Sequence, residues 1–71
     1  MAITLSAKQW RMIWEQLYNS GETNISGRIA HDVGHVWNGE NWDERVSLDF
    51  GDGFLDDVRD AADKAGVRIS G

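Results

Sequence analysis

The sequence contains no cysteine, no proline and no long run of apolar residues. Without cysteine there can be no disulfide bond and no thiolate metal site. A helix that spans a bilayer needs about 20 consecutive apolar residues, and the first ten residues, MAITLSAKQW, lack the pattern of a signal peptide. These absences lead us to expect a cytoplasmic protein that is not inserted in a membrane.

Basic residues are also few, seven against twelve acidic ones, so the formal net charge is −5. The imbalance lies in residues 38–63, which hold nine acidic residues against Arg45 and Arg59. A negative field repels nucleic acids and anionic membranes and attracts basic proteins. We therefore expect a protein partner with a basic surface, and no direct contact with nucleic acid or membrane. The alternative is that the acidic residues only maintain solubility.

The 71 residues are expected to form a single small domain, residues 1–71. Folding such a chain costs about 1.5 kcal/mol of conformational entropy per residue, so its core must be densely packed. Seven aromatic residues, four of them tryptophan, can supply that density.

Residues 45–66 predict a strand, a glycine-rich turn and a helix at about residues 53–65. Asp52 is the predicted N-cap, Lys64 lies in the last turn, and Gly66 follows the helix end. On a helical wheel, one face is acidic and holds Asp52, Asp56, Asp60 and Asp63. The opposite side is apolar and holds Phe54, Leu55, Val58, Ala61, Ala62 and Ala65. The pattern predicts a helix that buries one face and exposes a row of carboxylates.

A second helix is predicted at about residues 7–19. Ser6 and Gln9 have the spacing of a capping box, and Asn19-Ser20-Gly21 ends the pattern. The apolar stripe, spaced i, i+3, i+4, i+7, i+8, is Trp10, Ile13, Trp14, Leu17 and Tyr18. The stripe is typical of a core-facing surface, and Met12 projects from the back of the helix.

Residues 28–37 fit two structures. As a helix they continue an apolar stripe of Ile25, Ile29, Val33, Val36 and Trp37. As a strand they alternate, and a turn at residues 38–41 would form a hairpin that places Trp37 opposite Trp42. The matched apolar faces of that hairpin, together with Gly27 and Gly34, favour the strand.

The predicted fold class is therefore α+β, with element order α-β-β-α-β. A β-hairpin at about residues 28–50 would form a small, mainly antiparallel sheet, and the helices at about 7–19 and 53–65 would pack on one face. Residues 67–69, Val-Arg-Ile, are expected to add a short last strand.

The string His31-Asp32-Val33-Gly34-His35 resembles the His-Asp core of the HD-domain phosphohydrolases. That resemblance implies a metal site in a helical domain, but the family's earlier histidine is missing. The string also resembles the zincin motif H-E-x-x-H, with Asp32 in place of the glutamate and with Glu40 or Glu44 as the third ligand. We assign no metal or other cofactor and keep His31, Asp32 and His35 as minor candidates for a hydrolase-like remnant.

Residues 51–56, GDGFLD, stand where a phosphate-binding loop would stand, after a strand and before a helix. The third glycine of that motif is Asp56 here, and the neighbouring carboxylates would repel an anion. The triplet Asp49-Phe50-Gly51 has no accompanying kinase motif. Nucleotide chemistry is therefore not predicted.

The functional hypothesis that remains is a non-enzymatic binding protein. Its contact residues would be Trp37 and Trp42 and the acidic side chains of Asp49, Asp52, Asp56, Asp57, Asp60 and Asp63. In composition the chain resembles phage-encoded inhibitors of host defence and antitoxin-like proteins. That resemblance implies a nucleic-acid mimic that inhibits a nucleic-acid-handling complex. The alternative is a structural subunit of a homo-oligomer, and a homodimer is compatible with the sequence.

Overall fold

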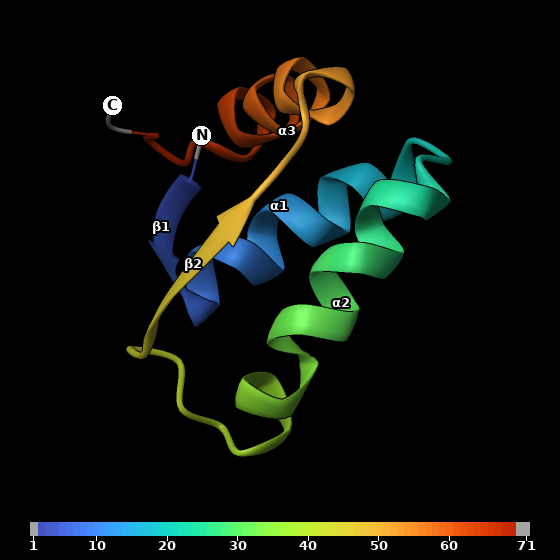
Figure 1. The fold of residues 1–71 in the computed structure, drawn as a ribbon. Coiled ribbons are helices and arrows are strands. Elements are labelled where there is room, and N and C mark those ends of the chain that lie inside the picture. The colour runs from blue at the N-terminus through green and yellow to red at the C-terminus, as the bar shows by residue number, and fades with distance from the viewer. Residues whose placement is uncertain (1, 70–71) are drawn as a thin grey trace.

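The structure, a computed structural model, describes residues 2–69. Its elements follow the order β-α-α-β-α (Figure 1): β1 (Ala2–Ser6), α1 (Ala7–Asn19), α2 (Thr23–Asn38), β2 (Arg45–Asp49) and α3 (Asp52–Ala65). The predicted α+β class is confirmed, and so are the helices at about 7–19 and 53–65. The predicted order of the elements is wrong, because β1 opens the chain and α2 replaces a predicted strand.

α1 is the helix against which the other two pack. Its predicted capping box is present: the Ser6 hydroxyl accepts from the Gln9 N–H at 3.3 Å, and the Gln9 side chain accepts from the Ser6 N–H at 3.0 Å. Trp10, Ile13 and Leu17 are buried, as their spacing predicts. A local hydrogen-bond pattern and an apolar stripe thus agree on where this helix begins and which face it buries.

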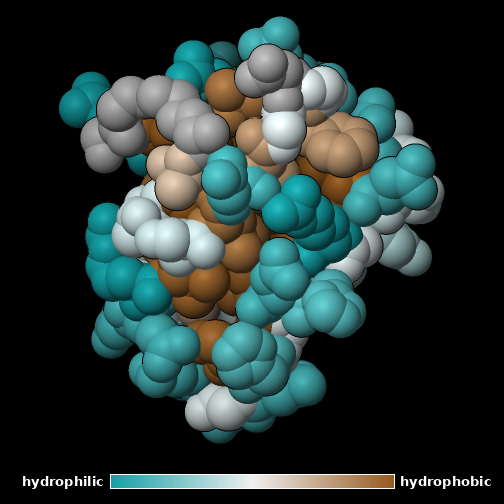
Figure 2. Space-filling view, in the orientation of Figure 1, coloured by the Kyte–Doolittle hydropathy of each residue, from teal (hydrophilic) through white to brown (hydrophobic). Residues whose placement is uncertain are grey.

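β1 and β2 form a two-stranded antiparallel sheet in which Ile3 pairs with Leu48 and Leu5 pairs with Val46. These alternate residues turn toward the helices, and Ile3, Leu5 and Leu48 are buried. The opposite side chains face solvent, where the hydroxyls of Thr4 and Ser47 form a hydrogen bond. Figure 2, which has the orientation of Figure 1, shows hydrophobic residues in the middle of the molecule, in the region of the strands, with hydrophilic residues around them.

The hairpin predicted at residues 28–50 is wrong, because residues 23–38 form α2. The helical stripe that competed with the strand pattern is the one that is buried: Ile25, Ile29, Val33, Val36 and Trp37. Gly27 and Gly34 did not prevent the helix, because their intrinsic cost of about 1 kcal/mol each is smaller than the stabilisation gained by burying this apolar stripe. β2 finds its partner in β1, 39 or more residues earlier in the chain.

The C-terminal part differs from the prediction in two details, the N-cap of α3 and the state of residues 67–69. α3 begins at Asp52 with Gly51 as N-cap, not with Asp52 as N-cap. Residues 67–69 form no strand, although Val67 is buried and its N–H donates to the Ala62 carbonyl at 2.8 Å. Gly66 ends the helix with a φ of 75°, a left-handed conformation that glycine adopts without strain. Residues 67–69 thus turn back onto the core without adding a third strand.

Candidate functional site: an acidic surface on α3

α3 exposes one row of carboxylates because its other side is held by the core. Val58, Ala61 and Ala62 are buried, and the helix packs along α1. The acidic side chains on the outer side are exposed: Asp56, Asp57, Asp60 and Asp63. Asp56 and Asp60, which are four residues apart, are displaced by about 6 Å along the helix axis. The outer surface of α3 is therefore an array of four carboxylates, with the exposed bases Arg59 and Lys64 beside them.

This acidic row borders a small cleft between the end of α1 and α3. The cleft has a volume of about 90 Å³ and is lined by Gln16, Leu17, Ser20, Glu22, Asp57, Asp60, Ala61 and Lys64. Three of these residues are carboxylic acids, and the single base, Lys64, places its Nζ 3.3 Å from Asp60 Oδ2. The last turn of α1 has no basic residue, so the negative end of its dipole adds to the same field. The cleft has the size and charge to accept a cationic group.

Two of the predicted contact residues, Asp49 and Asp52, are not part of the acidic array that the structure describes on α3. Asp49 ends β2, and its backbone carbonyl accepts a hydrogen bond from Arg28. Asp52 is the first residue of α3, and its side chain lies outside the described part of the structure. The array therefore rests on the four aspartates from Asp56 to Asp63. The sequence did not single out Glu22, because this residue joins the array only through the packing of α1 on α3.

The two tryptophans that were predicted to flank a hairpin tip differ in exposure: Trp37 is buried and Trp42 is partly exposed. Trp37 is buried on α2, where its indole N–H donates to the Ala7 carbonyl at 2.8 Å and its ring meets Trp14 edge-on at 5.9 Å. Trp42 lies in the loop before β2 and is 38% exposed. Trp37 cannot serve as a contact residue for a partner, whereas Trp42 is accessible.

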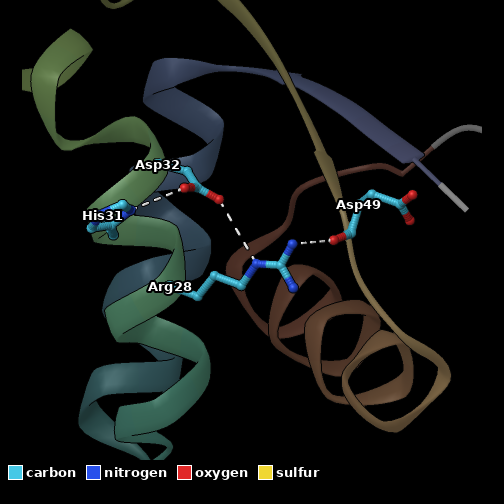
Figure 3. A network of polar contacts seen from close by, with 4 residues as sticks. All are labelled: Arg28, His31, Asp32 and Asp49. Carbon is cyan, nitrogen blue, oxygen red and sulfur yellow. Dashed lines mark hydrogen bonds and ion pairs between the residues drawn. The ribbon is translucent and has the colours of Figure 1, made fainter.

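The candidate metal ligands His31, Asp32 and His35 lie on α2 rather than on a strand. The His31 side chain is 88% exposed, and its Nδ1 lies 3.2 Å from Asp32 Oδ1 (Figure 3). Glu40 follows α2 in the loop, as does Glu44. Within residues 2–69, no group of three or more His, Cys, Asp or Glu side chains is arranged to hold a metal ion. The described residues therefore do not bring together the set of metal ligands that the resemblance to metal-dependent hydrolases implies.

Asp32 instead takes part in a contact that joins α2 to β2 through Arg28 (Figure 3). Arg28 Nη2 donates to the Asp49 carbonyl at 2.6 Å, and Arg28 Nε lies 3.8 Å from Asp32 Oδ2. The guanidinium also lies 5.3 Å from the centre of the Phe50 ring. Arg28 thus fastens the end of β2, from which the chain enters α3.

Replacing Arg28 with alanine is expected to lower the free energy of unfolding by about 1–2 kcal/mol, since it removes a hydrogen bond and a cation–π contact. Asp32→Asn should change it by less than about 0.5 kcal/mol, because exposed ion pairs contribute little. Urea denaturation followed by circular dichroism measures both. An Arg28→Ala loss no larger than that of Asp32→Asn would show that Arg28 does not fasten β2.

Sequence reasoning missed a second accessible surface, where Trp42 and Met12 of α1 line the same cleft. Both side chains are 38% exposed. The exposure of Met12 follows from its place at the back of the helix. No pattern in the neighbouring sequence predicts that Met12 and Trp42 line one cleft. This arrangement arises because the Lys8 N–H donates to the Trp42 carbonyl at 3.1 Å.

The chain is a small α+β protein with an exposed acidic helix. Comparison with protein-family models, with curated proteins and with solved structures finds no match to it. None of the helices in the described part of the chain is both long enough and apolar enough to cross a membrane.

Proposed function

We propose that this chain is a non-enzymatic binding protein that engages a basic surface of a protein partner through α3. The observation that carries the proposal is the exposed row Asp56, Asp57, Asp60 and Asp63 on a helix whose opposite side is anchored in the core. A rigid array of charges costs little conformational entropy when it binds. It also increases the rate of encounter with an oppositely charged partner.

The cleft beside the row supplies a specific contact. Glu22, Asp57 and Asp60 line, together with Lys64 and four uncharged residues, a space of about 90 Å³, which suits the end of one lysine or arginine side chain. An arginine would gain most, because its planar guanidinium forms paired hydrogen bonds with carboxylates. The row then provides long-range attraction, and the cleft selects a partner that presents a basic side chain at this position.

A basic protein surface that attracts carboxylates also attracts the phosphates of nucleic acids, because both groups are anions. We therefore extend the proposal to a nucleic-acid mimic that inhibits a nucleic-acid-handling complex, in the manner of phage-encoded inhibitors of host defence. The net charge of −5 opposes direct binding to nucleic acid or to an anionic membrane. A cytoplasmic setting, where such complexes act, is part of the same proposal.

The test is capture of partners from a bacterial lysate on the immobilised chain at low salt, followed by elution with double-stranded DNA. We expect duplex DNA to release the captured protein, because both ligands compete for one basic surface. Elution with an equal concentration of an uncharged polymer controls for non-specific release. Capture that duplex DNA does not reverse would contradict mimicry, and failure to capture any protein at low salt would contradict the binding function itself.

A further inference from the structure

α1 carries a second accessible surface that is separate from the acidic cleft. Here a cleft of about 480 Å³ is lined by Lys8, Arg11, Met12, Glu15, Trp42 and Asp43. It shares no residue with the acidic cleft between α1 and α3. Its apolar walls are the partly exposed side chains of Met12 and Trp42, each 38% exposed.

The walls of this cleft are fixed by backbone hydrogen bonds. The Ala7 N–H donates to the Glu44 carbonyl at 2.8 Å, and the Lys8 N–H donates to the Trp42 carbonyl at 3.1 Å. These bonds satisfy the first free N–H groups of α1 and hold the loop against the helix. Trp42 is therefore presented beside Met12 in a preformed arrangement, which reduces the entropic cost of covering it.

The charges of the cleft are balanced, in contrast with the rest of this acidic chain. Lys8 and Arg11 stand against Glu15 and Asp43. Arg11 is already engaged, since its Nε lies 3.4 Å from Glu15 Oε1 and its guanidinium lies 4.6 Å from the centre of the Trp14 ring. Two copies of the chain that approach each other through this cleft therefore bring no local excess of negative charge into contact, unlike two acidic rows.

We propose that this cleft binds a second copy of the chain, with the two α1 helices packed antiparallel around a two-fold axis between positions 11 and 12. Lys8 and Glu15 are equally distant from that midpoint in the sequence. The two-fold axis therefore brings Lys8 of each copy opposite Glu15 of the other. The Met12 side chains meet at the centre, and each Trp42 covers apolar surface of the opposite copy.

The charge pattern selects a second copy over an unrelated occupant. A site for a basic or an acidic partner would carry an excess of one sign, whereas this one carries two bases and two acids, and its Lys8 and Glu15 are equally far in the sequence from the midpoint between positions 11 and 12. α1 is only about 20 Å long, so the interface is small and a dissociation constant in the micromolar range is expected. The two clefts share no residue, so no residue that lines the acidic cleft of either copy is used in the proposed dimer interface.

Sedimentation velocity of the whole chain from about 1 to about 500 µM tests the proposal, since this range spans a micromolar dissociation constant. We expect a concentration-dependent shift toward twice the 8.0 kDa mass of the chain. Lys8→Glu or Glu15→Lys alone should each raise the dissociation constant about tenfold or more, because each places like charges opposite each other. The double variant Lys8→Glu with Glu15→Lys should restore it to within about threefold.

Trp42→Ala is a second variant that does not rely on charge, and we expect it to weaken the dimer about tenfold. Circular dichroism of every variant verifies that the helices are intact. A wild-type chain that stays monomeric over the whole range overturns the proposal. So does a dimer that single charge reversals leave unchanged, or one that the double variant fails to restore.

Discussion

Replacing Trp10 with alanine is expected to lower the free energy of unfolding by about 3–5 kcal/mol. That loss is comparable with the whole stability of a 71-residue domain, which is of order 4–10 kcal/mol. Trp10 is fully buried, and its ring lies 5.9 Å from that of Phe50. Its indole N–H donates to the Val46 carbonyl at 2.9 Å. The side chain thus joins α1 to β2 and to the segment that leads into α3.

Two further variants separate the causes of this loss. Trp10→Phe keeps most of the apolar contact but leaves the Val46 carbonyl without this donor, so we expect a smaller loss of about 1–3 kcal/mol. Trp42→Ala removes the same kind of side chain from a partly exposed position and should cost about 1 kcal/mol or less. Urea denaturation followed by far-ultraviolet circular dichroism measures all three. Equal losses for Trp10→Ala and Trp42→Ala would show that Trp10 does not anchor the core.

Neutralising the acidic row is expected to have the largest effect on binding. Changing Asp56, Asp57, Asp60 and Asp63 together to asparagine should weaken binding to the captured partner about 30-fold or more at low salt. These side chains are exposed, so their replacement should leave the fold intact. The difference should shrink as salt rises, because exposed charges are screened beyond about 8–10 Å near physiological ionic strength. Isothermal titration calorimetry at several salt concentrations measures both effects.

A matched pair of double variants distinguishes a specific surface from net charge. Asp57→Asn with Asp60→Asn removes two carboxylates from the acidic cleft, whereas Glu40→Gln with Glu44→Gln removes two from the loop before β2. Both change the net charge by the same amount. We expect about a tenfold loss of affinity for the first pair and less than about threefold for the second. Equal losses would mean that total charge alone attracts the partner and that α3 is not the contact surface.

The elements that depend on neighbouring residues were predictable. The capping box at Ser6, the end of α1 after Asn19 and the left-handed Gly66 each follow from a few adjacent residues, and the structure has all three. The acidic face of α3 follows from helical periodicity in the same way. Tyr18 marks the limit of such reasoning, because it belongs to the apolar stripe of α1 yet is 58% exposed and stacked on Trp14 at 5.1 Å.

The prediction failed where two local patterns were nearly equivalent. Residues 28–37 satisfy both a strand alternation and a helical stripe, and the matched hairpin pattern with residues 42–50 favoured the strand. The hairpin required β2 to pair with residues near it in the sequence. In the structure Leu48 pairs with Ile3 instead, which releases the segment to bury its helical stripe against α1.

The sequence by itself determined the helices at each end of the chain, the side of α3 that is buried and the row of carboxylates on its other side. These features depend on residues three to four positions apart, whose interactions are the same in any fold that buries the apolar stripe. The tertiary structure decided the partner of β2, the helical state of residues 23–38, the burial of Trp37 and the cleft that Trp42 shares with Met12. It also brought Glu22 beside Asp57 and Asp60. Those outcomes depend on contacts between residues far apart in the chain, where the total burial of apolar surface outweighs the preference of each segment.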